Sequence, residues 1–122
     1  MNRRISSDSA YADLVGYARA VVAGPFVFVS GCTSTVDGAY EQTLAAFAVA
    51  ERALAQAGLG RADVVRTRMY VTDIGLWEEV GRAHRELFDA VRPATTMLQV
   101  SALIDPRMLV EVEVDAYRES AS

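Results

Sequence analysis

The stretch that most constrains the fold is MLVEVEVDAY, residues 108–117. Apolar and acidic residues alternate along it: Val110, Glu111, Val112, Glu113, Val114, Asp115 and Ala116. Successive side chains of a strand point to opposite faces, so the apolar residues share one face and the carboxylates share the other. We therefore predict a strand in a sheet that is packed against other elements on one face only.

The remaining elements follow from hydrophobic periodicity and turn residues. Runs rich in valine, phenylalanine and threonine predict strands at 18–23, 26–31, 64–72 and 94–100, and Gly24-Pro25 marks the turn between the first two. Apolar residues at three- and four-residue spacing predict helices at 40–57 and 75–91. The resulting order is β-β-α-β-α-β-β, which indicates an α+β fold with two helices on one face of a mixed sheet. The polar ends, residues 1–12 and 119–122, are expected to be mobile.

Length and composition narrow the class of protein. A chain of 122 residues favours a single domain, residues 1–122. The net charge is −4 without a basic stripe, so we expect no nucleic-acid partner. No apolar run approaches the roughly 18 residues that span a bilayer, and the N-terminus lacks the apolar core of a signal peptide. With a single cysteine, Cys32, these features predict a cytoplasmic protein without membrane contact.

The carboxylate face of the predicted sheet has no predicted element to cover it. Helices on one side leave the other face bare, and neighbouring strands would add apolar side chains to it. Exposed patches of this kind are typical of oligomerisation surfaces. A closed cyclic assembly would bury the faces against one another.

Several motifs occur in an order that is similar to one known family: GPFVFVSG (24–31), EQT (41–43), ADVVRTRMYVTDI (62–74), RELF (85–88), RPA (92–94) and LVEVEVDAY (109–117). Over residues 17–117 the chain resembles the Rid/YjgF family of reactive-intermediate deaminases. The resemblance implies a chorismate-mutase-like fold and a homotrimer with a barrel-like centre. It also implies ligand clefts between adjacent subunits, where deaminases of the family hydrolyse 2-imino and 2-enamino acids to 2-oxo acids and ammonia.

The resemblance carries over to individual residues only in part. Tyr17 and Gly31 match residues that line the family's cleft, and Glu111 matches the glutamate that positions or activates water. The arginine that anchors the substrate carboxylate is replaced by Thr95, and a cysteine two residues later is replaced by Met97. A threonine cannot form the bidentate, charge-assisted pair that a carboxylate requires. We therefore predict a poor 2-imino-acid hydrolase, with Thr95 and Met97 shaping the pocket.

Other residues leave alternatives open. Arg19 and Arg107 are either substitute anchors or surface arginines. Cys32 lies at the expected mouth of the cleft and would need a base such as His84 to act as a nucleophile. The spacing of His84 with its apolar neighbours instead favours packing in the core.

Four more positions also leave alternatives open. Glu111 is either an acid–base group or a structural carboxylate, whereas Glu113 and Asp115 are expected to be structural or solvated. Gly81 stands where the family commonly has an asparagine in the second helix. It either leaves space for a larger ligand or permits close packing.

The leading hypothesis is a homotrimer that binds a small organic molecule in its subunit clefts. It would hydrolyse or tautomerise an imine or enamine with Glu111 as the catalytic acid–base group. Tyr17, Arg19, Gly31, Cys32, Thr95 and Met97 are the expected substrate-binding residues. The alternative is a non-catalytic trimer that binds a small ligand or a partner. RNA cleavage, known from old family descriptions, is disfavoured by the acidic charge. No cofactor or metal is predicted, because no ligand cluster or phosphate-binding loop occurs.

Overall fold

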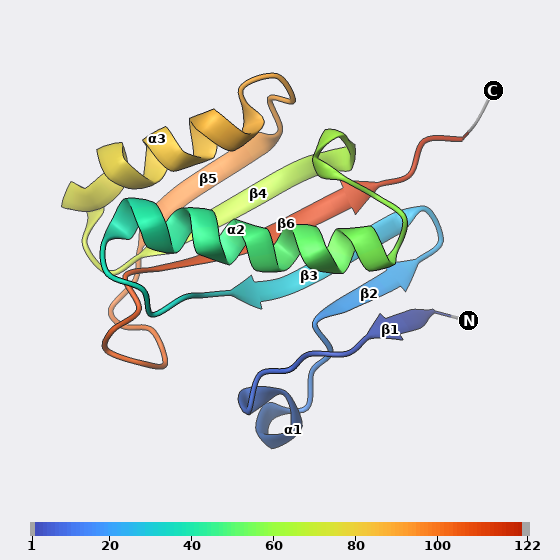
Figure 1. Cartoon of the computed structure of the whole chain (residues 1–122), viewed down its shortest axis with the longest axis horizontal. Coiled ribbons are helices and arrows are strands. Elements are labelled where there is room, and N and C mark those ends of the chain that lie inside the picture. Colours follow the sequence, from blue (N-terminus) through green and yellow to red (C-terminus); the bar gives the residue numbers. More distant parts are fainter. Residues whose placement is uncertain (1, 121–122) are drawn as a thin grey trace.

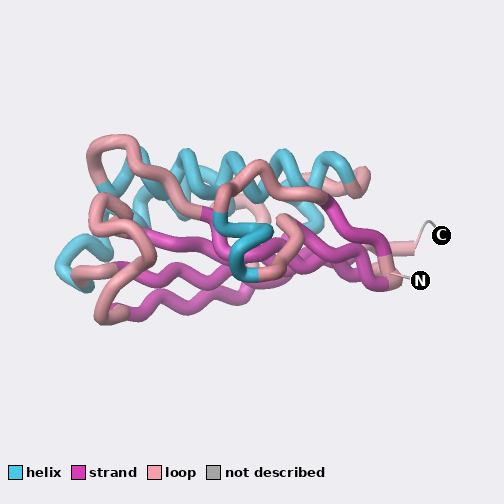
Figure 2. Tube along the Cα trace, turned by 90° about the horizontal axis from the view of Figure 1, so that it is seen from below, coloured by secondary structure: helices cyan, strands magenta, loops and turns pink. Residues whose placement is uncertain are grey.

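The structure is a computed structural model that describes residues 2–120. It has two layers: α2 and α3 lie side by side over one face of a six-stranded sheet (Figures 1 and 2). The strands are β1 (Arg3–Ile5), β2 (Ala20–Ala23), β3 (Phe26–Cys32), β4 (Val64–Val71), β5 (Ala94–Gln99) and β6 (Val110–Tyr117). The helices are α1 (Tyr11–Val15), α2 (Ala39–Gln56) and α3 (Trp77–Phe88).

The sheet has the order β1-β2-β3-β6-β4-β5. The alternating strand β6 lies between β3 and β4 and is antiparallel to both. Among the strands of residues 2–120, only β4 and β5 are parallel, because α3 carries the chain back across the sheet between them (Figure 1). The α+β class, the mixed sheet and the placement of two helices on one face are thereby confirmed.

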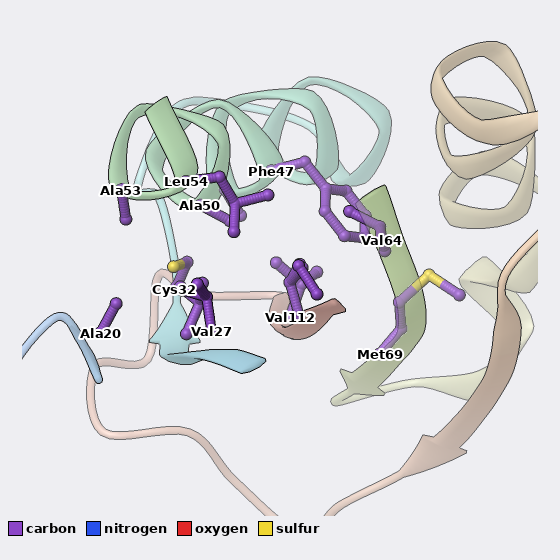
Figure 3. Packing of buried hydrophobic residues seen from close by; sticks show 14 of the residues in the cluster. Ala20, Val27, Cys32, Phe47, Ala50, Ala53, Leu54, Val64, Met69 and Val112 are labelled. Carbon is purple, nitrogen blue, oxygen red and sulfur yellow. The ribbon is translucent and has the colours of Figure 1, made fainter. Parts of the chain in front are cut away.

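The core lies between α2 and the valine side of the sheet (Figure 3). Phe47 and Leu54 of α2 are fully buried, as are Val112 and Val114 of β6. Alanines on the same face of α2 allow the helix to lie close to the strands, and this close packing gives a small domain a dense interior. Alternation in β6 therefore decides which face of the sheet is packed.

The N-terminal segment differs from the expectation of a mobile end. Residues Arg3–Ile5 form an edge strand paired with β2, and Ile5 is buried. The helix α1 follows and ends at Gly16, whose φ of 91° suits a glycine. The expectation failed because two buried side chains, Ile5 and Ala12, and three backbone pairings order a segment that is polar overall. At the other end, 119–120 lie outside helices and strands, and 121–122 lie outside the described residues.

The second face of the sheet carries the acidic side chains and an aromatic cluster. Phe26 stacks on Phe28 at 5.6 Å between ring centroids and contacts Tyr117 edge-on at 5.1 Å. All three rings are exposed, and beside them Asp115 pairs with Arg68 at 3.2 Å. The alternation thus leaves a mixed apolar and charged surface uncovered by α2 and α3. Within residues 2–120, none of the helices is long and apolar enough to cross a membrane.

Candidate functional site

A cleft of about 390 Å³ lies at the end of the sheet where β3 and β6 meet the N-terminal segment. Tyr17, Arg19, Gly31 and Glu111, four of the residues expected from the sequence, line it together. Ser30 and Thr33 extend the polar wall on either side of Gly31. The cleft therefore has a polar floor built from a glycine, an arginine and a glutamate.

An irregularity in strand pairing shapes this floor. The register between β3 and β6 shifts between Val29 and Cys32, so Ser30 and Gly31 bulge out of regular pairing. Bulges commonly re-aim side chains beside functional sites, and glycine in a strand often marks close approach of another group. A Cβ at Gly31 would lie 2.1 Å from Oε2 of Glu111. The absence of a side chain at Gly31 therefore makes room for the carboxyl group of Glu111.

Glu111 is half-buried and lines the cleft. Among the described residues, its carboxylate accepts no hydrogen bond and forms no ion pair. Partial burial raises the pKa of Glu111 above its ordinary value, and the nearby Glu113 carboxylate raises it further, against the opposing charge of Arg19. A carboxyl group with a raised pKa can exchange protons nearer neutral pH than an ordinary glutamate.

Arg19 is a buried residue, with 9% of its surface exposed, and so is not a surface arginine. Its Nη1 donates to the carbonyl oxygen of Gly31 at 2.9 Å and to Sγ of Cys32 at 3.4 Å. Its Nη2 donates to Oγ of Ser7 at 3.1 Å. The N-terminal segment thus helps to hold the guanidinium in place. Arg107, in contrast, is exposed and pairs with Asp105 at 2.7 Å, outside the cleft lining.

The loop before β6 contributes Ile104 and Met108 to the cleft wall, and Gln42 of α2 holds this loop. The buried amide of Gln42 donates from Nε2 to the carbonyl oxygens of Val36 and Arg107, both at 2.9 Å. Its Oε1 accepts the backbone N–H of Leu109 at 2.8 Å. The position of Met108 in the cleft wall is fixed in this way, so Gln42 acts on the site through the backbone.

Two of the expected pocket residues lie in or against the core instead. Cys32 is buried beneath α2 (Figure 3), and burial raises the pKa of its thiol to about 11. Its Sγ donates to the carbonyl oxygen of Ser30 at 3.2 Å, and Cys32 does not line the cleft. Met97 is half-buried beside Met69, its neighbour in register. A Cys–His pair is not formed, because His84 bonds to Thr67 and packs against Phe88.

Thr95 lies on the opposite face of the sheet from Glu111. It pairs in register with Thr67, and the two hydroxyl oxygens are 2.6 Å apart. The Oγ1 of Thr67 is also 2.7 Å from Nε2 of His84, whose pKa is lowered by burial. Thr95 and His84 line a second cleft of about 300 Å³ under the end of α3. A single chain therefore does not bring Thr95 and Glu111 into one cleft.

Sequence reasoning missed the apolar half of the first cleft. Tyr11 and Val15 reach it from α1, and Ile104 and Met108 reach it from the loop before β6. The available signal was Gly16, a helix-ending residue just after a short apolar stretch. Residues 2–120 contain no group of three histidine, cysteine, aspartate or glutamate side chains that could hold a metal ion.

Fold and cleft together define a class: a small α+β protein with a half-covered sheet and a glutamate-containing cleft beside a strand bulge. A family model described as Endoribonuclease L-PSP matches residues 7–118, and the chain belongs to this family. An uncharacterized protein of Streptomyces coelicolor is 47% identical over 123 residues, covering 95% of this chain and 92% of that protein. A RutC family protein of Aquifex aeolicus is 29% identical and covers 93% and 95% of the two chains.

Solved structures of family members have the same fold as this chain. A crystal structure of a YjgF/YER057c/UK114 family member from Mycobacterium tuberculosis has 50% sequence identity and a TM-score of 0.93, covering 96% of this chain and 99% of that one. A YjgF family member from Neisseria meningitidis has 26% identity and a TM-score of 0.81, covering 99% and 98%. The resemblance to the Rid/YjgF family and its fold is confirmed.

Proposed function

We propose that the protein binds a small organic molecule in the cleft around Glu111. There it hydrolyses or tautomerises a C=N or enamine substrate, with Glu111 as the catalytic acid–base group. The observation that carries this proposal is the carboxyl group of Glu111, which lies over Gly31 in a cleft without a hydrogen-bond or ion-pair partner in the described chain. A carboxyl group with a raised pKa and no structural partner is typical of acid–base sites.

The chemistry differs from that of the family's standard deaminases. Thr95 stands at the position of the family's anchoring arginine, and its hydroxyl is engaged with Thr67. A neutral hydroxyl binds a substrate carboxylate much more weakly than a guanidinium does. We therefore expect slow clearance of 2-iminopropionate generated in situ by an amino-acid oxidase. Clearance as fast as that of an arginine-bearing homologue would contradict this part of the proposal.

We also propose that the active form is a homotrimer. Support comes from the exposed aromatic cluster of Phe26, Phe28 and Tyr117 on the uncovered face of the sheet. Contiguous apolar patches of this kind usually meet another protein surface. Sedimentation equilibrium should give the mass of three chains, and Phe28→Glu should give a folded monomer. A monomeric wild-type protein at micromolar concentration would refute the assembly.

The activity is tested with preformed aryl imines, N-benzylidenemethylamine and its 4-carboxy derivative, by loss of the imine absorbance. Glu111→Gln keeps the size of the side chain and removes its acid–base function, and Glu119→Gln is a matched control on an exposed glutamate. We expect Glu111→Gln to lose turnover of at least one imine while keeping the assembly mass of the wild type. Glu119→Gln should retain turnover. Ligand binding without turnover in the wild type would favour the alternative, a non-catalytic binding trimer.

A further inference from the structure

Charge in the cleft around Glu111 is balanced. Among the described residues that line it, only Arg19 and Glu111 carry a full charge, and the two signs are opposite. They lie close enough for the guanidinium to lower the pKa of the Glu111 carboxyl group, against the larger effect of burial. A charged ligand would therefore meet a like charge beside any opposite one. This balance favours a ligand without net charge.

The guanidinium of Arg19 is engaged by the chain itself. Its Nη1 donates to the carbonyl oxygen of Gly31 and to Sγ of Cys32, and its Nη2 donates to Oγ of Ser7. These bonds tie the bulge of β3 to the N-terminal segment. Arg19 therefore acts on the cleft by holding the backbone at Gly31.

The other part of the lining is apolar. Val15 of α1 is 69% exposed, and Ile104 of the loop before β6 is 59% exposed, although both side chains are aliphatic. Tyr11 and Met108 complete this part of the lining. Aliphatic side chains are stabilised when they leave water, so these exposed residues favour contact with an apolar group of a ligand.

The size of the cleft agrees with its polarity. A volume of about 390 Å³ lies in the range of pockets that hold drug-sized molecules. A molecule as small as 2-iminopropionate would leave most of the apolar lining in contact with water. An aromatic ring or a branched alkyl group would cover that lining.

We propose that the substrate is an uncharged imine or enamine with an aromatic ring or a branched alkyl group on its reacting carbon, and that Val15 and Ile104 select this group. The inference rests on the proposed function and names the substrate class for the same site. In imine hydrolysis, water adds to the C=N carbon and the C–N bond then breaks, which gives an apolar aldehyde or ketone and an amine. Both protons of the water end on the leaving nitrogen, and Glu111 transfers them.

Unreactive amides test this preference without requiring turnover. Acetamide, benzamide and 4-carbamoylbenzoate are titrated into ¹⁵N-labelled full-length protein, and the shifts of the Gly31 and Thr33 amides give the dissociation constants. We expect benzamide to bind at least about tenfold more tightly than acetamide, because its ring contacts the apolar lining. The anion 4-carbamoylbenzoate, which adds only a carboxylate, should bind no more tightly than benzamide.

Substitutions in the apolar lining test which residues select the ring. Val15→Ser and Ile104→Ser should each weaken benzamide binding about threefold or more and leave acetamide binding unchanged. Two exposed aliphatic residues outside the lining give matched controls, Leu14→Ser on the same helix and Ile74→Ser before α3, and neither should change benzamide binding. With N-benzylidenemethylamine as substrate, Val15→Ser should raise KM and leave kcat unchanged. The 4-carboxy derivative should have a lower kcat/KM than this neutral imine.

The outcomes separate this inference from the proposed function. Equal binding of acetamide and benzamide, or tighter binding of 4-carbamoylbenzoate than of benzamide, overturns the inference and leaves catalysis by Glu111 standing. The selecting role of α1 is overturned if Val15→Ser and Leu14→Ser have the same effect. It is also overturned if Val15→Ser changes the assembly mass, since Val15 would then lie in a contact between copies of the chain.

Failure of the proposed function gives a different pattern. A preference for benzamide without turnover of any imine supports the ligand class and refutes catalysis by Glu111. If none of the three amides shifts the Gly31 and Thr33 signals, both the inference and the cleft as the ligand site are overturned.

Discussion

Glu111 places its carboxyl group where a side chain at position 31 would stand, with Oε2 only 2.1 Å from the Cβ that Gly31 lacks. The two residues come from adjacent strands, β6 and β3, at the point where their pairing is irregular. The cleft therefore depends on a missing methyl group as much as on the carboxyl group. Gly31 and Glu111 can each be substituted separately, so the contribution of each to the cleft can be measured.

Gly31→Ala should move the Glu111 carboxyl group out of its place. The new Cβ collides with the end of a flexible side chain rather than with backbone, so we expect the free energy of unfolding to change by about 1 kcal/mol or less. The pKa of Glu111 should return toward its ordinary value as the group becomes more hydrated, which ¹³C-detected NMR titration measures. Gly60→Ala is the control, because nothing lies within 4 Å of its added Cβ. An unchanged pKa in Gly31→Ala would contradict the close approach.

Glu111→Gln should change stability in a pH-dependent way. The pKa of Glu111 is raised in the folded protein by burial and by Glu113, so the folded state favours the protonated form. Its contribution to stability is complete below the pKa of the unfolded chain and is lost as pH rises through the folded pKa. The variant should thus be more stable than wild type at pH 7, and the gain should vanish near pH 4. Urea unfolding at the two pH values measures this, and Glu119→Gln should show no such trend.

Cys32 should be unreactive in the folded protein. Its thiol is buried, and with a pKa of about 11 only about one molecule in a thousand carries the thiolate at pH 8. We expect iodoacetamide to label no more than a trace of native protein in one hour and to label it fully in 8 M urea. Rapid native labelling, seen by intact mass, would show that Cys32 opens to solvent.

Thr67→Val should destabilise the fold by about 1–3 kcal/mol, because it leaves the ring nitrogen of His84 without its partner in a partly buried site. Thr67 is fully buried and also bonds Thr95, whose own side chain is exposed. Thr95→Ala, as the comparison, should cost much less because water can replace its hydroxyl. Equal losses in the two variants, measured by urea unfolding, would refute the central role of Thr67.

Two glycines offer a test of backbone conformation alone. A Cβ at Gly81 or at Gly16 meets no atom within 4 Å, but Gly16 has φ of 91° and Gly81 lies inside α3. Gly81→Ala should raise the free energy of unfolding by about 0.5–1 kcal/mol through helix propensity. Gly16→Ala should lower it by about 1 kcal/mol, because the left-handed conformation is strained for alanine. Destabilisation by Gly81→Ala would indicate that this position is needed for packing against another molecule.

Local pattern was enough to predict most of the fold. Alternation in 108–117 set the two faces of the sheet, and the spacing of Phe47, Ala50 and Leu54 set the buried side of α2. These inferences succeeded because strand and helix periods act over a few residues and need no knowledge of partners. The same pattern did not predict the short segments 3–5 and 11–15. Their order comes from the pairing of β1 with β2 and from the burial of Ile5 and Ala12.

The sequence by itself determined that Glu111 faces away from the core and that position 95 lacks an arginine. Only the tertiary structure decided which residues share a cleft with Glu111. It brought Arg19, Gly31 and the loop at Met108 together, and it placed Cys32 in the core and Thr95 on the other face. The physical reason is that a strand bulge and the packing of distant segments set these contacts, whereas local periodicity records only the face on which each side chain lies.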